Sequence, residues 1–170
     1  MNNKIVGLIF LLSLVLLGAD GGDQARDERD VLQEQREVLR QRIEKLTEEQ
    51  DFLLFQKEMY AADSKYLVLT IAGKTGRLMY RNRALKDFRF RTSKNYPATT
   101  FGPGRLLLTK KADEKRERRA LIFGNALVIK WKRTKVPPQE ADIPVISVTK
   151  KEMRSLFYAV EEGAQAYLVR

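Results

Sequence analysis

The fold can be predicted from residues 65–90, which read KYLVLTIAGKTGRLMYRNRALKDFRF. β-Branched and aromatic residues fill 66–71, a turn cluster with two glycines occupies 72–76, and 77–80 forms the returning strand. After a second turn, residues 84–90 alternate apolar and charged side chains, which is the pattern of a strand with one buried face and one wet face. The period of two predicts a sheet in this part of the chain.

Further strands are expected downstream, separated by residues that favour turns. They are residues 105–109, a pair within 120–131 that turns at Gly124-Asn125, and residues 143–148 and 164–169. The clustered charges Lys110-Lys111, Lys115-Arg116 and Arg118-Arg119 are expected to lie in or beside a loop.

One short helix is predicted between the last two strands. Thr149 and Glu152 form a capping box, in which each side chain accepts a hydrogen bond from the backbone of the other. The apolar residues that follow recur at helical spacing, and core packing explains them without a ligand: Met153, Leu156, Phe157 and Val160. Gly163 is expected to end this helix as its C′ residue.

Charge divides the chain near residue 60. Residues 23–58 contain 11 acidic and 7 basic residues, whereas residues 59–170 contain 24 basic and 10 acidic ones. Such a change of sign indicates two modules with different roles. We therefore expect a signal peptide or membrane anchor at 1–22, an acidic helix or coiled coil at 23–62, and a basic β-rich domain at 63–170.

Residues 5–19 form an uncharged apolar run that follows Lys4. This is the layout of a secretory signal, and the run is shorter than the roughly 20 residues that a spanning helix needs. Ala19-Asp20-Gly21 offers a small-x-small cleavage pattern, but a long helical pattern directly after the run is also frequent in anchored proteins. Cleavage and retention both stay open. Either one predicts an exported protein, periplasmic or anchored in the inner membrane with its domain outside the cytoplasm.

The acidic segment predicts one continuous helix, because it is rich in good helix formers and contains no Gly or Pro from Gln24 to Ala72. Its candidate self-association residues are leucines at seven-residue spacing and one apolar residue at the companion position: Leu32, Leu39, Leu46, Leu53 and Ile43. A weak parallel homodimer through residues 24–58 is one interpretation, and a single helix packed on its own domain near residues 52–55 is the other. The complete pattern predicts an α+β fold. Its mainly antiparallel β-sandwich-like domain has one C-terminal helix and follows a long N-terminal helix.

Histidine and cysteine are both absent from the 170 residues. Their absence excludes disulfides, nucleophiles that depend on a His base, and zinc sites with His or Cys ligands. No nucleophile motif is recognised and no cofactor is expected. An enzyme would have to rely on carboxylates or lysines, and the nearest acidic pairs are Glu114 with Glu117 and Glu140 with Asp142. We therefore expect a protein that is not an enzyme.

The order of elements resembles the L,D-transpeptidase catalytic domains. Residues 65–90 follow the strand, turn, Gly-x-Leu-x-Tyr, turn, strand rhythm that opens those domains, with Gly76, Leu78 and Tyr80 at the named positions. Residues 148–169 are similar to their ending, in which an acidic helix start is followed by Leu-aromatic, Val, Gly and an apolar strand. The bend at 99–104 is loosely similar to their Thr-Pro-x-Gly turn.

The catalytic signature of that family is a His upstream of Ser-His-Gly-Cys, just before the terminal helix. Residues 135–144 of this chain read KVPPQEADIP at that place, without a thiol or an imidazole. The resemblance therefore implies a non-catalytic relative that keeps the scaffold. We expect an envelope protein that binds the cell wall or a protein partner.

Basic residues lie beside aromatic ones in the second half of the domain, a pattern that can form a groove for a polyanion. The candidate binding surface is Lys115, Arg116, Arg118, Arg119, Lys130, Trp131, Lys132 and Arg133. A cell-wall polymer or an acidic protein surface is the expected partner, and nucleic acid is not expected outside the cytoplasm. The alternative is a salt-sensitive module for polyanions or anionic lipids, in which the helix serves as a spacer.

Overall fold

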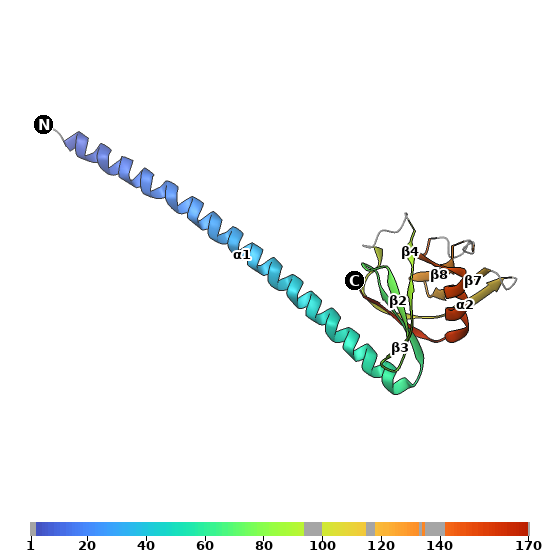
Figure 1. Cartoon of the computed structure of the whole chain (residues 1–170). Coiled ribbons are helices and arrows are strands. Elements are labelled where there is room, and N and C mark those ends of the chain that lie inside the picture. The colour runs from blue at the N-terminus through green and yellow to red at the C-terminus, as the bar shows by residue number, and fades with distance from the viewer. Residues whose placement is uncertain (1–2, 94–99, 115–117, 133, 135–141, 170) are drawn as a thin grey trace. The chain divides into compact units, whose positions relative to one another are not determined.

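The computed structural model describes residues 3–93, 100–114, 118–132, 134 and 142–169 (Figure 1). For residues 3–28, Glu114 and Arg118 it describes the backbone only. Two compact units are distinguished, Met1–Thr47 and Glu48–Arg170.

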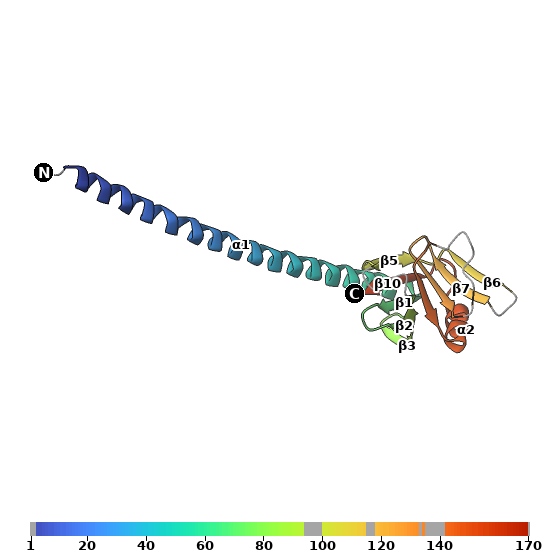
Figure 2. The same cartoon turned by 90° about the horizontal axis from the view of Figure 1, so that it is seen from above.

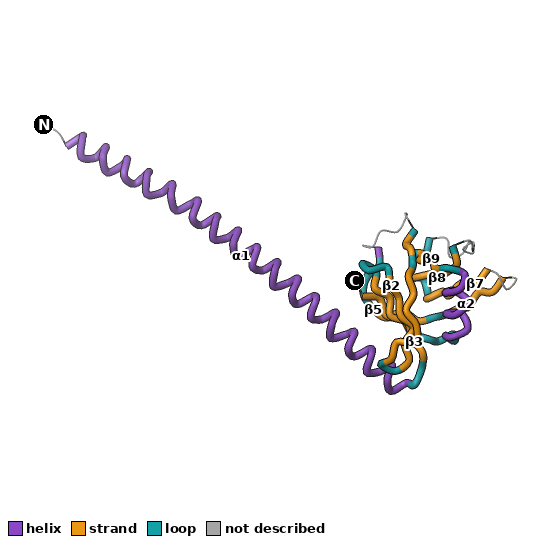
Figure 3. The backbone as a smooth tube through the Cα atoms, in the orientation of Figure 1, coloured by secondary structure: helices purple, strands orange, loops and turns teal. Residues whose placement is uncertain are grey.

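One helix, α1 (Asn3–Ala62), makes up the first unit and continues into the second (Figure 3). The apolar run at residues 5–19, predicted to be a signal peptide or an anchor, is helical throughout. In the described part of the chain, no helix is long and apolar enough to span a membrane. The export segment stays a prediction, as do the domain boundaries at residues 22 and 62.

Within the described residues of the second unit, ten short strands and a second helix follow α1. They are β1 (Lys65–Thr70), β2 (Thr75–Tyr80), β3 (Arg83–Arg89), β4 (Arg91–Thr92), β5 (Gly104–Leu107), β6 (Lys110–Glu114), β7 (Arg118–Phe123), β8 (Leu127–Trp131), β9 (Val145–Val148), α2 (Lys150–Ala159) and β10 (Gln165–Val169).

These strands form two five-stranded sheets. The first sheet has the order β3-β2-β1-β10-β5, which Figure 2 shows, and the second has the order β4-β9-β8-β7-β6. β1 with β10 and β8 with β9 are parallel pairs, and the other described pairs are antiparallel. The predicted α+β fold with mainly antiparallel sheets and one C-terminal helix is confirmed.

Lys110, Lys111, Arg118 and Arg119, expected in or beside a loop, lie in strands. β6 and β7 form a ladder there, from Lys110 opposite Ile122 to Glu114 opposite Arg118. β6 lies at the edge of the second sheet, and edge strands often carry charged side chains because these prevent further pairing. A charged edge strand and a charged loop therefore look alike in sequence.

The predicted end of α2 at Gly163 is wrong. The helix ends at Ala159, and its C-cap residue Val160 is extended, with φ −109° and ψ 147°. Val160 leaves the helix with its side chain buried in the core. Gly163 lies beyond, at φ +87°, in the turn that leads to β10, and its N–H donates to Leu108 O at 2.8 Å.

The centre of the first sheet is buried on both faces, which explains why Tyr66 to Leu69 of β1 are all apolar rather than alternating. Leu67 and Leu69 contribute to the main core, which also contains residues of the second sheet and of α2. Tyr66 and Val68 point to the opposite face, where they pack on the last turns of α1. That smaller cluster consists of Phe55, Met59, Tyr66, Val68, Met79 and Tyr167.

Gly76 is required by close packing inside the first sheet. A Cβ atom added there would lie 2.9 Å from Leu69 Cδ2 and closer still to the ring of Phe88, the residue paired with Gly76 across β2 and β3.

Gly76→Ala should therefore lower the free energy of unfolding by about 1–3 kcal/mol, a typical cost of overpacking. Gly73→Ala is the matched control, because its added Cβ would meet atoms only at 3.4 Å and beyond. Chemical denaturation of both variants tests this, and equal losses would contradict it.

Candidate functional site

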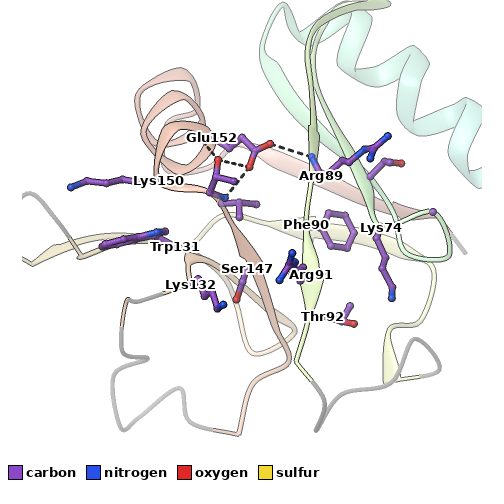
Figure 4. A pocket seen from close by; sticks show the side chains of 14 residues that line it. Lys74, Arg89, Phe90, Arg91, Thr92, Trp131, Lys132, Ser147, Lys150 and Glu152 are labelled. Carbon is purple, nitrogen blue, oxygen red and sulfur yellow. Dashed lines mark hydrogen bonds between the residues drawn. The ribbon is translucent and has the colours of Figure 1, made fainter.

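A groove of about 1110 Å³ lies where four segments of the domain meet (Figure 4). The segments are the β1–β2 turn, the passage from β3 to β4, the end of β8, and β9 with the start of α2. We call it the basic groove. Its lining residues are Gly73, Lys74, Thr75, Arg89, Phe90, Arg91, Thr92, Trp131, Lys132, Ser147, Val148, Thr149, Lys150 and Glu152.

The passage from β3 to β4 carries the chain from the first sheet to the second. Phe88 and Phe90, two residues apart, are both buried in the main core, and the N–H of Phe90 donates to Lys74 O at 3.0 Å. Because successive side chains of an extended chain point to opposite sides, Arg89 and Arg91 are exposed. Arg91 then pairs with Ser147 of β9. The apolar core thus places two guanidinium groups at the groove.

Five cationic side chains line the groove, compared with one carboxylate among the described lining residues. The cations are Lys74, Arg89, Arg91, Lys132 and Lys150, and the carboxylate is Glu152. The ammonium of Lys150 lies 5.3 Å from the ring centre of Trp131, within the range of a cation–π contact. The groove is therefore positively charged and has an aromatic wall.

Glu152 is occupied by structural hydrogen bonds. One carboxylate oxygen accepts from the N–H and the hydroxyl of Thr149 at 2.8 and 2.7 Å, and the other accepts from the N–H of Arg89 at 3.4 Å. The N–H of Glu152 donates back to the Thr149 hydroxyl, so the predicted capping box is present. Partial burial by itself would raise the pKa of Glu152, but the bonds from Thr149 and Arg89 outweigh burial and lower it. Glu152 therefore stays charged and joins α2 to the β3–β4 passage.

Two of the predicted binding residues, Trp131 and Lys132, line the groove. Lys130, one residue earlier, does not line it. Its ammonium donates to the carbonyl oxygen of Thr134, and desolvation by burial lowers its pKa. Strand alternation explains why neighbouring residues in the sequence face different surroundings.

Arg119 has a different environment from the groove residues. Its side chain is only 11% exposed, pairs with Asp113 at 3.3 Å, donates to the Tyr158 hydroxyl at 2.9 Å and lies over the ring of Phe157. Arg119 thus joins β6 and β7 to α2. Lys115, Arg116 and Arg133 lie outside the described residues, and the structure describes only the backbone of Arg118, in β7.

The acidic pairs considered for an enzyme are described only in part. Glu117 and Glu140 lie outside the described residues, and only the backbone of Glu114 is described. Among the described residues, no three acidic side chains gather as they would to hold a metal ion. The expectation of a protein without enzymatic activity stays a prediction.

Ser147 and Lys150 have the Ser-x-x-Lys spacing of some serine nucleophiles, which the expectation of no nucleophile motif overlooks. In Figure 4 the Lys150 side chain extends over Trp131 and away from the Ser147 hydroxyl. A serine nucleophile needs its base within hydrogen-bond reach. The geometry therefore does not combine these two residues into a catalytic pair.

Four cationic groove residues were missing from the predicted binding surface: Lys74, Arg89, Arg91 and Lys150. Arg89 and Arg91 were recognisable as charges that alternate with buried phenylalanines. Their position in the same groove as Trp131 depends on the pairing of β9 with both β4 and β8, which joins distant parts of the chain. Local sequence patterns do not contain that information.

Comparison with solved structures finds L,D-transpeptidases. The chain shares 13% identity with an L,D-transpeptidase from Stackebrandtia nassauensis, over 63% of this chain and 56% of that chain, with a TM-score of 0.49. L,D-transpeptidase 1 of Mycobacterium tuberculosis shares 13% identity over 64% of this chain and 62% of that chain, with a TM-score of 0.48. The catalytic domain of the E. faecium L,D-transpeptidase shares 10% identity over 63% of this chain and 98% of that chain, with a TM-score of 0.49. The chain thus spans less than two thirds of the first two structures.

The resemblance predicted from the sequence is confirmed as a structural one at low identity. No family model and no curated protein matches this sequence.

Glu152→Gln should weaken the junction between α2 and the β3–β4 passage. At neutral pH we expect a loss of about 1 kcal/mol in unfolding free energy, since capping interactions contribute roughly 0.5–2 kcal/mol. The folded pKa of Glu152 is lowered from its ordinary value of 4.5, so its charge contributes fully above that pH. The difference between wild type and variant should shrink as the pH falls below 4.5 through the folded pKa. Denaturation curves between pH 7 and pH 3 measure it, and a difference independent of pH would contradict this role.

Proposed function

We propose that this chain is a non-catalytic protein of the cell envelope whose basic groove binds the carboxylate-bearing peptide stems of a cell-wall polymer. The single observation that carries the proposal is the set of five cations that line the groove together with Trp131. Export is inferred from the apolar run at residues 5–19, which would bring the domain to the compartment of the wall.

The chemistry of the groove suits carboxylates on a polar polymer. A guanidinium group presents a planar pair of N–H donors that matches a carboxylate, and Arg89 and Arg91 supply two such groups. The indole of Trp131 offers an apolar surface on which a sugar ring or an aliphatic side chain can pack. The Glu152 carboxylate accepts hydrogen bonds from Thr149 and from the backbone N–H of Arg89. It is therefore held in place and competes less with an incoming anion for the cationic side chains.

The non-catalytic part of the proposal rests on the residue types available. Without His and Cys, a hydroxyl nucleophile would need a carboxylate or a lysine as its base. Thr149 is bonded to Glu152 within the capping box, and Lys150 is directed toward Trp131 rather than Ser147. These arrangements favour binding over bond cleavage.

Co-sedimentation of the full chain with purified peptidoglycan, in a mild non-ionic detergent, tests the proposal. We expect retention that survives high salt, because a shaped groove contributes contacts that salt does not screen. Arg91→Glu with Lys132→Glu should reduce the affinity at least about tenfold, since two charge-assisted contacts of roughly 1.5–3 kcal/mol each are lost. Retention that disappears with salt would favour the alternative, a general binder of polyanions or anionic lipids. No retention at low salt would contradict wall binding.

The matched control reverses two cations in the first sheet, at the ends of β1 and β3 that lie away from the groove. Lys65 and Arg83 are exposed and both flank Tyr80 in the register of the first sheet, whereas the groove lies at the Thr75 and Arg89 end. Lys65→Glu with Arg83→Glu makes the same change in net charge. An equal loss of retention in both double variants would show that net charge, not the groove, controls binding.

The only tryptophan of the chain lines the groove, so its fluorescence reports on this site alone. Soluble muropeptides should change the emission of Trp131 and should leave it unchanged in the Arg91→Glu, Lys132→Glu variant. The same muropeptides should be recovered intact, with wild type and Ser147→Ala indistinguishable. Turnover that depends on Ser147 would contradict a non-catalytic role.

A further inference from the structure

An exposed apolar stripe runs along α1. We define the leucine stripe as Leu32, Leu39, Leu46 and Leu53 together with Ile43. Each of these side chains is between 54% and 64% exposed. Large apolar side chains repeated on one helix face every seven residues are the pattern of a coiled-coil seam.

The domain of the same chain packs on a different face of the helix. Phe55 and Met59 are buried against the first sheet, whereas Leu53 is 64% exposed. Two residues correspond to roughly 200° around an α-helix, so Leu53 and Phe55 lie on nearly opposite sides. The contacts with the sheet therefore leave the end of the stripe uncovered.

We propose that α1 pairs with α1 of a second copy of this chain, in parallel, through the leucine stripe. This inference is independent of the ligand of the groove. A second copy suits the stripe because each leucine layer would meet its own equivalent, and leucine at this heptad position favours two-stranded coiled coils.

Charge also favours a second copy. Between residues 29 and 54, all but one of the seven acidic residues occupy heptad positions remote from the stripe: Asp30, Glu34, Glu37, Glu44, Glu48 and Asp51. Two helices that meet along the stripe therefore keep their acidic faces apart. The segment can self-associate although its net charge is negative.

The residues that flank the seam favour a parallel orientation. In a parallel pair, Gln35 would lie beside the partner's Arg40, Arg42 beside the partner's Thr47, and Glu49 beside a leucine, so no like charges meet at the positions that flank the seam. Inside the seam, Arg29 and Arg36 would each face their own equivalent, and their long side chains would have to extend toward solvent. In the antiparallel register that joins all four leucine layers, Arg40 would face the partner's Arg40 and Arg42 the partner's Arg42. The parallel arrangement avoids that repulsion at the flanking positions.

The proposed dimer is weak and reversible. Arg29, Arg36 and Gln50 occupy the companion seam position, where only Ile43 is apolar. Polar residues at this position lower stability while they restrict register and the number of strands.

Site-directed disulfide crosslinking of the full chain in expressing cells tests the proposal. The chain contains no cysteine, so one introduced cysteine can join only to itself in a second copy. After mild oxidation, Leu39→Cys and Leu46→Cys should each give a product of twice the 19.7 kDa chain mass. Gln41→Cys is the control, because Gln41 is also exposed but lies roughly 200° around the helix from Leu39. It should give several-fold less dimer.

Three outcomes would overturn the proposal. Equal crosslinking at residues 39 and 41 would indicate random collision. Absence of dimer at both leucine positions, with full-length protein present, would show that the stripe has another occupant or none. Dimer that forms only when Arg36→Cys and Leu46→Cys chains are expressed together would indicate the antiparallel arrangement. Binding to peptidoglycan is not part of this assay, so its failure and that of the proposed function are separable.

Discussion

The burial of Phe88 and Phe90 in one core is the constraint on which the candidate site depends. The two rings belong to the same apolar cluster although the chain passes from the first sheet to the second between β3 and β4. Gly76 leaves room for Phe88, and the Phe90 N–H bond to Lys74 O fixes the β1–β2 turn beside the passage. Because side chains alternate along an extended chain, burying the phenylalanines exposes Arg89 and Arg91. Core packing and groove charge are thus two consequences of one four-residue pattern.

Glu152 is a carboxylate in a groove that stays positively charged, because five cations line it as well. Its oxygens accept hydrogen bonds from Thr149 at the start of α2 and from the backbone of Arg89. The same side chain therefore caps a helix and links that helix to the β3–β4 passage. A carboxylate fixed in this way is a structural group, whereas the lysines and arginines around it extend from exposed positions. Because the carboxylate has a structural role and the cations are exposed, an anionic ligand would match the groove better than a cationic one.

Sequence patterns predicted the parts of the fold that depend on near neighbours. The β1–β2 hairpin and the Thr149–Glu152 capping box are local, and both are present. The end of α2 was predicted wrongly because Val160 is drawn out of the helix into the core, a tertiary effect. β6 was missed because a charged edge strand resembles a loop. The groove was only half predicted: Trp131 and Lys132 lie near one another in sequence, but Arg91 reaches them through the pairing of β9 with β4 and β8.

The two proposals combine in one physical consequence. A dimer formed through the leucine stripe would carry two basic grooves, and a wall polymer repeats its carboxylates along its length. Once one groove is occupied, binding of the second becomes intramolecular, at an effective concentration set by the connection between them. Weak grooves and a weak dimer can then give firm retention on a polymer while each stays weak toward a soluble fragment. The chain should therefore bind the polymer more tightly than it binds a soluble fragment. Disruption of the leucine stripe should remove this difference, because the avidity needs both the helix and the domain.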